Sequence, residues 1–169
     1  MTSRSFTGLV LAAVLLAPAA ATAQTSGGNT FSLGILGGAE FGEFSGFQLR
    51  ADGEVPIVRA NPRLQVSGVL SLSYAGLEDD LSVLEILPAA RLTYTASPQF
   101  GVYGDLGLGF ARAAQGDNSD TGATMRIGAG AFYQMNRQVA FPFELMIHPH
   151  FGDYNETTAT LMFGAKFRF

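Results

Sequence analysis

A strict alternation of apolar residues with polar or small residues runs through nearly the whole chain after residue 30. The last ten residues, TLMFGAKFRF, show the pattern clearly, because Phe163 and Phe167 fall on one face and Lys166 on the other. Successive side chains of a β-strand point to opposite faces, so a period of two predicts strands. The predicted strands span approximately residues 30–41, 45–57, 63–74, 82–95, 99–112, 123–135, 138–148 and 160–169.

Every predicted strand has one apolar face, and this face has two possible environments. In a soluble sandwich or a lipocalin-like barrel it forms the core, whereas in a membrane barrel it meets lipid and the polar face fills the lumen. Not one charge falls mid-strand on the apolar face, where lipid would impose a cost of about 2–4 kcal/mol. A soluble core would exclude charges too. The polar face carries Glu40, Arg50, Asp52, Glu54, Glu85, Arg91, Asp105, Arg126, Glu144, Lys166 and Arg168.

The connections and the aromatic residues favour the membrane barrel. Short connections (VRANP, ASP, MNR) alternate with longer polar ones (GLEDD, AAQGDNSDTG, PHFGDYNET), as periplasmic turns alternate with extracellular loops in outer-membrane barrels. The connection around Glu43 is short and fits less well. Outward aromatic residues cluster near both strand ends, which predicts two girdles around an aliphatic band. We therefore predict an eight-stranded antiparallel up-and-down transmembrane β-barrel, whose narrow interior is filled by side chains.

The N-terminus has the layout of a secretory signal peptide. Arg4 precedes an apolar stretch at residues 6–17, and small residues end at Ala21-Thr22-Ala23. The apolar stretch is shorter than the roughly 20 residues that a spanning helix needs. We expect a signal peptide at 1–23 and a barrel domain at 24–169. The chain has no cysteine, so its fold does not depend on disulfides, and its net charge of −4 argues against a nucleic-acid partner.

The C-terminal GAKFRF carries a family resemblance. Together with the architecture, it resembles the small eight-stranded outer-membrane barrels of Gram-negative bacteria, the OmpA/OmpX type and related porin-like proteins. The resemblance implies that Gly164, Phe167 and Phe169 form the signal that the barrel-assembly machinery reads, by pairing of an amphipathic strand with its own sheet edge. Met162 stands where that family usually has a polar residue. The resemblance also implies an outer-membrane location, contact with lipid and lipopolysaccharide, a monomer and no cofactor.

Several functions remain open for such a barrel. We favour a non-catalytic barrel with a structural or surface-interaction role, and the alternatives are a narrow porin and a soluble periplasmic lipocalin-like binding barrel. Some related barrels modify lipopolysaccharide with a lipid-facing His-x-Ser pair, but this chain has His148-Pro149-His150 and no serine to complete the pair. A zinc site at His148, His150 and Asp153 is conceivable, although a solvated rim is the favoured interpretation of these residues.

Acidic residues gather in the expected extracellular loops, with only Arg112 opposing them. Such a cluster suits divalent cations that bridge to lipopolysaccharide phosphates, or simple solvation, which we favour. The residues are Glu43, Glu78, Asp79, Asp80, Asp117, Asp120, Asp153 and Glu156.

Overall fold

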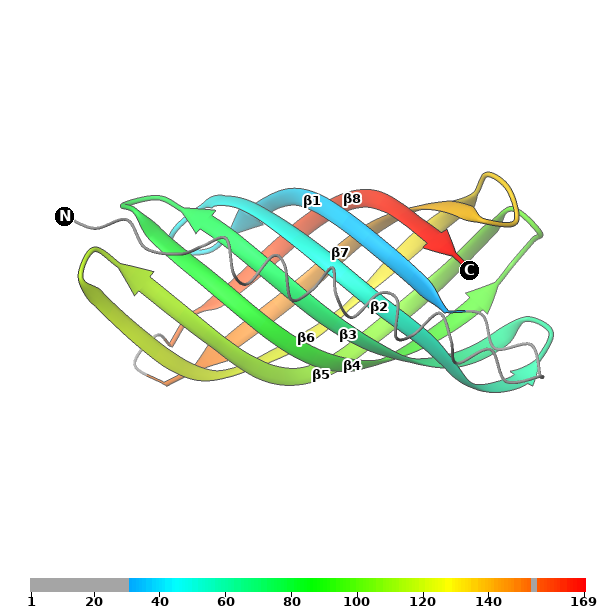
Figure 1. The fold of residues 1–169 in the computed structure, drawn as a ribbon, viewed down its shortest axis with the longest axis horizontal. Coiled ribbons are helices and arrows are strands. Elements are labelled where there is room, and N and C mark those ends of the chain that lie inside the picture. The colour runs from blue at the N-terminus through cyan, green and yellow to red at the C-terminus, as the bar shows by residue number, and fades with distance from the viewer. Residues whose placement is uncertain (1–30, 153–154) are drawn as a thin grey trace.

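The computed structural model describes residues 31–152 and 155–169, and these form eight strands (Figure 1). The predicted signal peptide and Asp153 lie outside the described residues. The described part of the chain contains no helix that is long and apolar enough to cross a membrane. The strands are β1 (Ser32–Phe41), β2 (Gly46–Asn61), β3 (Leu64–Leu77), β4 (Leu81–Thr95), β5 (Phe100–Gln115), β6 (Asn118–Gln134), β7 (Val139–Phe151) and β8 (Thr157–Arg168).

The strands form one closed antiparallel barrel in chain order, which confirms the predicted fold class. Each strand pairs with its sequence neighbours, and β8 returns to pair with β1 from Ser32↔Arg168 to Phe41↔Ala159. Closure gives every strand two partners, so no sheet edge is left open, as a structure surrounded by lipid requires.

The two faces of the barrel are sorted as a membrane requires. The large apolar side chains of the outer surface, such as Ile35, Leu70 and Leu106, are 41–66% exposed. Most of the predicted polar-face charges are buried in the interior, for example Arg50 and Glu144. A soluble lipocalin-like barrel would have the opposite arrangement, so that alternative is wrong.

The connections differ from the predicted alternation of short turns and long loops. Residues 42–45, 78–80, 116–117 and 152–156 join strands at one end, which we call the distal end, and residues 62–63, 96–99 and 135–138 join them at the other, the terminal end (Figure 1, left and right). The predicted long loop at residues 113–122 is strand except for 116–117, and the other two predicted loops are shortened by strands that continue into them. Asp79 and Asp80 both have positive φ, and so does Gly116, as the tight turns of β-hairpins demand. Alternation alone missed these turns because strand pairing continues through polar sequence.

The aromatic residues form the two expected girdles except on β7 and β8, where they also occur between the girdles. Phe31 and Phe169 stack at the terminal end, with their ring centroids 6.3 Å apart. Toward the distal end, the ring centroids of Phe47 and Tyr74 are 6.2 Å apart. On β7 and β8, however, Phe143 pairs in register with Phe163 within the strands, and both side chains are exposed. The lipid-facing surface is therefore partly aromatic at mid-height as well.

The charge-filled barrel interior as the candidate functional site

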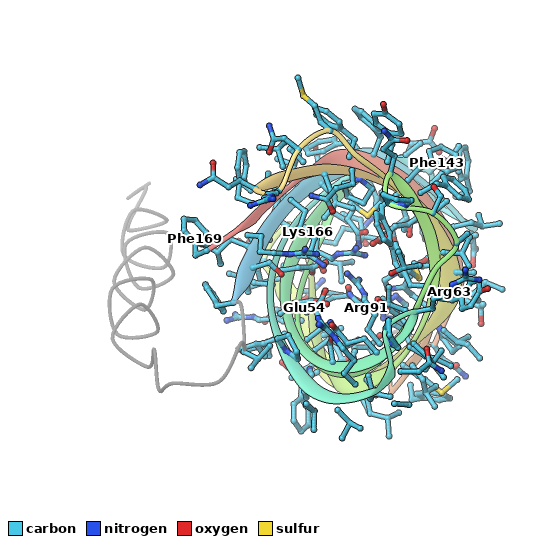
Figure 2. The ribbon with its side chains drawn as sticks, turned by 90° about the vertical axis from the view of Figure 1, so that its right-hand side faces the viewer. Glu54, Arg63, Arg91, Phe143, Lys166 and Phe169 are labelled. Atoms are coloured by element: carbon cyan, nitrogen blue, oxygen red, sulfur yellow. The ribbon has the colours of Figure 1, made fainter. Side chains whose placement is uncertain are left out.

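Eight charged side chains from six strands meet in the interior between its middle and the terminal end, and we call them the lower network. Four are carboxylates and four are cations, so their formal charges balance. They are Arg50, Asp52, Glu54, Arg91, Asp105, Arg126, Glu144 and Lys166. Figure 2, seen from the terminal end, shows Glu54, Arg91 and Lys166 pointing into the barrel while Phe143 and Phe169 point outward.

Arg91 is the centre of the lower network. Its Nε and Nη2 donate to the two carboxylate oxygens of Asp105 at 2.7 and 2.6 Å, and its Nη1 donates to Glu54 Oε2 at 3.1 Å. The guanidinium also lies 3.4 Å from a Glu144 oxygen and 4.3 Å from the centre of the Tyr103 ring. A planar guanidinium can serve several carboxylates and an aromatic face at once, which lysine cannot.

The other cations complete the network from the surrounding strands. Arg50 pairs with Glu144 and, through Nε, with Asp52 Oδ1 at 3.0 Å, while Lys166 Nζ donates to Glu54 Oε2 at 2.5 Å. Arg126 Nη2 lies 3.6 Å from Asp105. Inward residues of β3 and β5 contribute as well, since Ser71 donates to Asp52 and Tyr103 to Glu144. Such a buried network is stable only while every member keeps its partners.

A second polar group lies toward the distal end, and we call Glu40, Glu85, His148 and His150 the histidine cluster. The Nδ1 atoms of His148 and His150 lie 3.5 and 3.8 Å from the two oxygens of Glu85. Thr160 on β8 is the register partner of Glu40. The Oγ1 atom of Thr160 lies 3.4 Å from His148 Nε2.

The histidine cluster corrects the favoured interpretation of HPH as a solvated rim. Both histidine side chains are buried, because β7 continues to Phe151 and carries positions 148 and 150 on the same inward face. Within residues 31–152 and 155–169, no three His, Cys, Asp or Glu side chains are grouped so as to hold a metal ion. The conceivable zinc ligand Asp153 lies outside that range.

An apolar cluster fills part of the interior at the distal end. It is built by inward residues of β3, β4 and β5, and the side chain of Phe44, from the β1–β2 connection, packs against it. The cluster contains Ala75, Leu77, Leu81, Val83, Ala111 and Ala113. Alternation did not single out this cluster, because these residues lie in the segments that were expected to be loops or loop-proximal.

The acidic residues gather at the distal rim. Glu43, Glu78, Asp79, Asp80, Asp117 and Glu156 lie in its connections, whereas Asp120 belongs to β6. The backbone N–H of Glu43 donates to the Glu156 carboxylate, which joins the two connections that flank β1 and β8. Arg112 is exposed on β5 and donates to Ser119 Oγ at 3.2 Å. The rim is therefore a ring of mostly acidic side chains.

The remaining predicted residues lie at the terminal end. Phe167 and Phe169 are exposed on the outside, and Gly164 faces β1 across the closing seam of the barrel. Arg168, which we expected in the lumen, is exposed at the mouth of the terminal end. Its register partner is Ser32, the first residue of β1, so the barrel wall ends before its guanidinium can be enclosed.

The comparisons with known proteins agree with this geometry. Residues 9–167 match the family described as the outer membrane protein beta-barrel domain. A search of the curated proteins found no match. Among solved structures, Neisserial surface protein A is similar with a TM-score of 0.68 and 14% identity, covering 86% of this chain and 100% of that one. Ail of Yersinia pestis is similar with a TM-score of 0.53 and 18% identity, covering 83% of this chain and 97% of that one. The outer membrane enzyme PagL is similar with a TM-score of 0.56 and 16% identity, covering 80% of this chain and 97% of that one.

At these identities the structural likeness establishes the fold, and the family match extends over nearly the whole sequence. A small barrel of the outer membrane is expected to be closed, with an apolar exterior that faces lipid and a charged interior, and this chain has all three features. The chain belongs to the outer membrane protein beta-barrel family and resides in the outer membrane, surrounded by its lipid and lipopolysaccharide.

Proposed function

We propose that this barrel is a non-catalytic, non-conducting protein with a structural or surface-interaction role, and that its acidic distal rim faces the outside of the cell. The observation that carries this proposal is the filled interior. The lower network crosses the lumen from β2 to β7, the histidine cluster lies beyond it, and the apolar cluster with Phe44 follows at the distal end. A filled lumen leaves the distal rim as the surface available to partners outside the cell.

The position of the histidines argues against lipid-modifying catalysis of the kind considered above. A catalytic histidine for a lipid substrate must reach a lipid on the outer surface, in hydrogen-bond range of the reacting group. His148 and His150 instead face Glu85 inside the barrel. PagL shares the fold, but fold does not determine activity.

Planar-bilayer recordings test the filled lumen. We expect the purified barrel to show no steady conductance, because Arg50, Arg126 and Glu144 are almost completely buried in the middle of the lumen. Steady conductance that changes on replacing Arg91 or Glu85 by glutamine would contradict the proposal and favour the narrow porin. Arg112→Gln, on the exposed outer part of β5, is the matched control for Arg91→Gln, because it removes the same positive charge outside the lumen.

We also propose that Gly164, Phe167 and Phe169 serve as the assembly signal that the resemblance implies, read by the barrel-assembly machinery from the periplasmic, terminal end. The support is their geometry. Phe167 and Phe169 are exposed, and in the folded barrel Phe169 makes only peripheral contacts, its N–H donating to Phe31 O at 2.9 Å and its ring stacking on Phe31. Such a residue contributes more to recognition than to packing.

Phe169→Ser is therefore expected to reduce the amount of barrel in the outer membrane several-fold while changing the stability of purified, refolded barrel little. Quantitative blotting of membrane fractions and urea unfolding in micelles measure the two effects. Phe100→Ser, another exposed phenylalanine at the terminal end, is the control for loss of lipid contact alone. Equal membrane levels of Phe169→Ser and the unsubstituted protein would refute the assembly role.

A further inference from the structure

The terminal end of the barrel opens into a cavity of about 230 Å³ that the filled lumen does not explain. Its floor is formed by Glu54, Arg91 and Tyr103, and Phe132 and Gln134 stand on its wall. Its lining also includes four cationic residues, Arg59, Arg63, Lys166 and Arg168, and we call this space the vestibule. By the usual volume per water, it has room for on the order of eight water-sized groups.

The vestibule holds an excess of positive charge. In the lower network four carboxylates already balance four cations, including the Arg91 and Lys166 that reach the vestibule floor. Arg59, Arg63 and Arg168 are three further cations that do not belong to the lower network. Within the described part of the chain, none of them takes part in an ion pair. Glu54, the acid in the lining, is bound to both Arg91 and Lys166. Three arginines that make no ion pair with any described residue therefore line this small space.

A β-bulge turns Arg59 toward this space. Strict alternation in β2 would place Arg59 with the outward Val55 and Ile57, but the pairing with β3 shifts between Pro56 and Val58. Ile57 and Val58 consequently both face outward, being 66% and 54% exposed. Arg59 then lies opposite the inward-facing Gln65 and donates from Nη2 to its Oε1 at 2.9 Å. Bulges at barrel rims commonly re-aim a side chain in this way.

The neighbouring turn fixes Arg63. The side-chain oxygen of Asn61 accepts hydrogen bonds from the backbone N–H groups of Arg63 and Leu64, both at 2.9 Å. Arg63 O in turn accepts from Thr95 N at 2.7 Å, which ties the turn to the end of β4. The backbone that carries two of the three unpaired arginines is thus held by the bulge and by this turn, so the charge excess is a feature of the fold.

We propose that the vestibule binds a small polyvalent phosphate anion of about pyrophosphate size from the periplasm. Arginine forks match the oxygens of phosphate, and convergent arginines supply the several charge-assisted hydrogen bonds that such an anion needs. The rings of Tyr103 on the floor and Phe132 on the wall stack with their centroids 6.4 Å apart, so aromatic side chains bound the space on that side. This site is independent of whether the lumen conducts.

Calorimetric titration of pyrophosphate into the full barrel, refolded in a zwitterionic detergent at low salt, tests the proposal. We expect saturable binding of one anion per barrel. Arg59→Gln and Arg168→Gln should each weaken it about tenfold, as expected for loss of one charge-assisted contact, and the double variant should weaken it further. Phosphatidylglycerol added to the micelles distinguishes the source, since a phosphate of a lipid headgroup would compete with pyrophosphate and a soluble anion site would be unaffected.

Arg112→Gln is the matched control, because it removes one exposed arginine at the opposite end of the barrel. It should bind pyrophosphate with unchanged affinity. Heat-modifiable migration on a gel verifies that each variant has folded. Absence of saturable binding, equal weakening by Arg112→Gln, or unchanged binding in the Arg59→Gln, Arg168→Gln double variant would each overturn the proposal.

Discussion

Arg91→Met is expected to destabilise the barrel by about 3–5 kcal/mol, the range observed when one partner of a buried ion pair is removed. Arg91 donates two hydrogen bonds to Asp105 and a third to Glu54. Its removal leaves the buried Asp105 without its closest cation, whereas Glu54 keeps only Lys166. Methionine matches the length of the aliphatic stem but provides no donor. Reversible urea unfolding in micelles, followed by tyrosine fluorescence and gel migration, measures the loss.

A double variant identifies the origin of this loss. Asp105→Asn removes the carboxylate that Arg91 binds most closely, so Arg91→Met combined with Asp105→Asn should cost less than the sum of the two single changes. The expected coupling is about 0.5–3 kcal/mol. Arg112→Met is the control and should stay within about 0.5 kcal/mol, as exposed positions do. A loss below about 1 kcal/mol for Arg91→Met would show that the lower network is not the main interior constraint.

Gly164→Ala is expected to destabilise the barrel by about 1–3 kcal/mol, through overpacking at the closing seam. A Cβ at this position would overlap the carbonyl oxygen of Ile35 and lie 2.7 Å from Leu36 Cα. Because these are backbone atoms of β1, they cannot move aside as a flexible side chain can, and β1 and β8 would have to separate. Unfolding of refolded protein in micelles, without any assembly machinery, isolates this packing effect.

Gly34→Ala provides the matched control for the seam. Gly34 lies in β1, also at the β1–β8 pairing, opposite Lys166, but the nearest atom to an added Cβ is Leu36 Cδ1 at 3.5 Å, an ordinary contact. We expect a change within about 0.5 kcal/mol. If both variants behaved alike in purified form, the glycine of GAKFRF would not be explained by close packing, and recognition during assembly would be its remaining role.

The alternation of residues by itself determined the eight strands and most of the interior charges, and the connections and aromatic residues were needed to favour the membrane barrel over a soluble one. Side-chain direction in a strand depends only on local geometry, and lipid excludes charge from the outer face. For this reason Arg50, Glu85 and Glu144 could be assigned to the lumen without knowledge of strand pairing. The same logic placed His148 inward, but it could not extend β7 far enough to bury His150.

The tertiary structure decided everything that depends on how strands are aligned. Which carboxylate Arg91 binds follows from the register of β4 with β5 and from the side chains that reach across the closed barrel. The tight turns at Asp79-Asp80 and Gly116 follow from pairing that continues through polar sequence. A bulge reverses the parity of Arg59, which no periodic pattern predicts. Periodicity is a property of one strand, whereas pairing, bulges and closure are set by non-local contacts between strands.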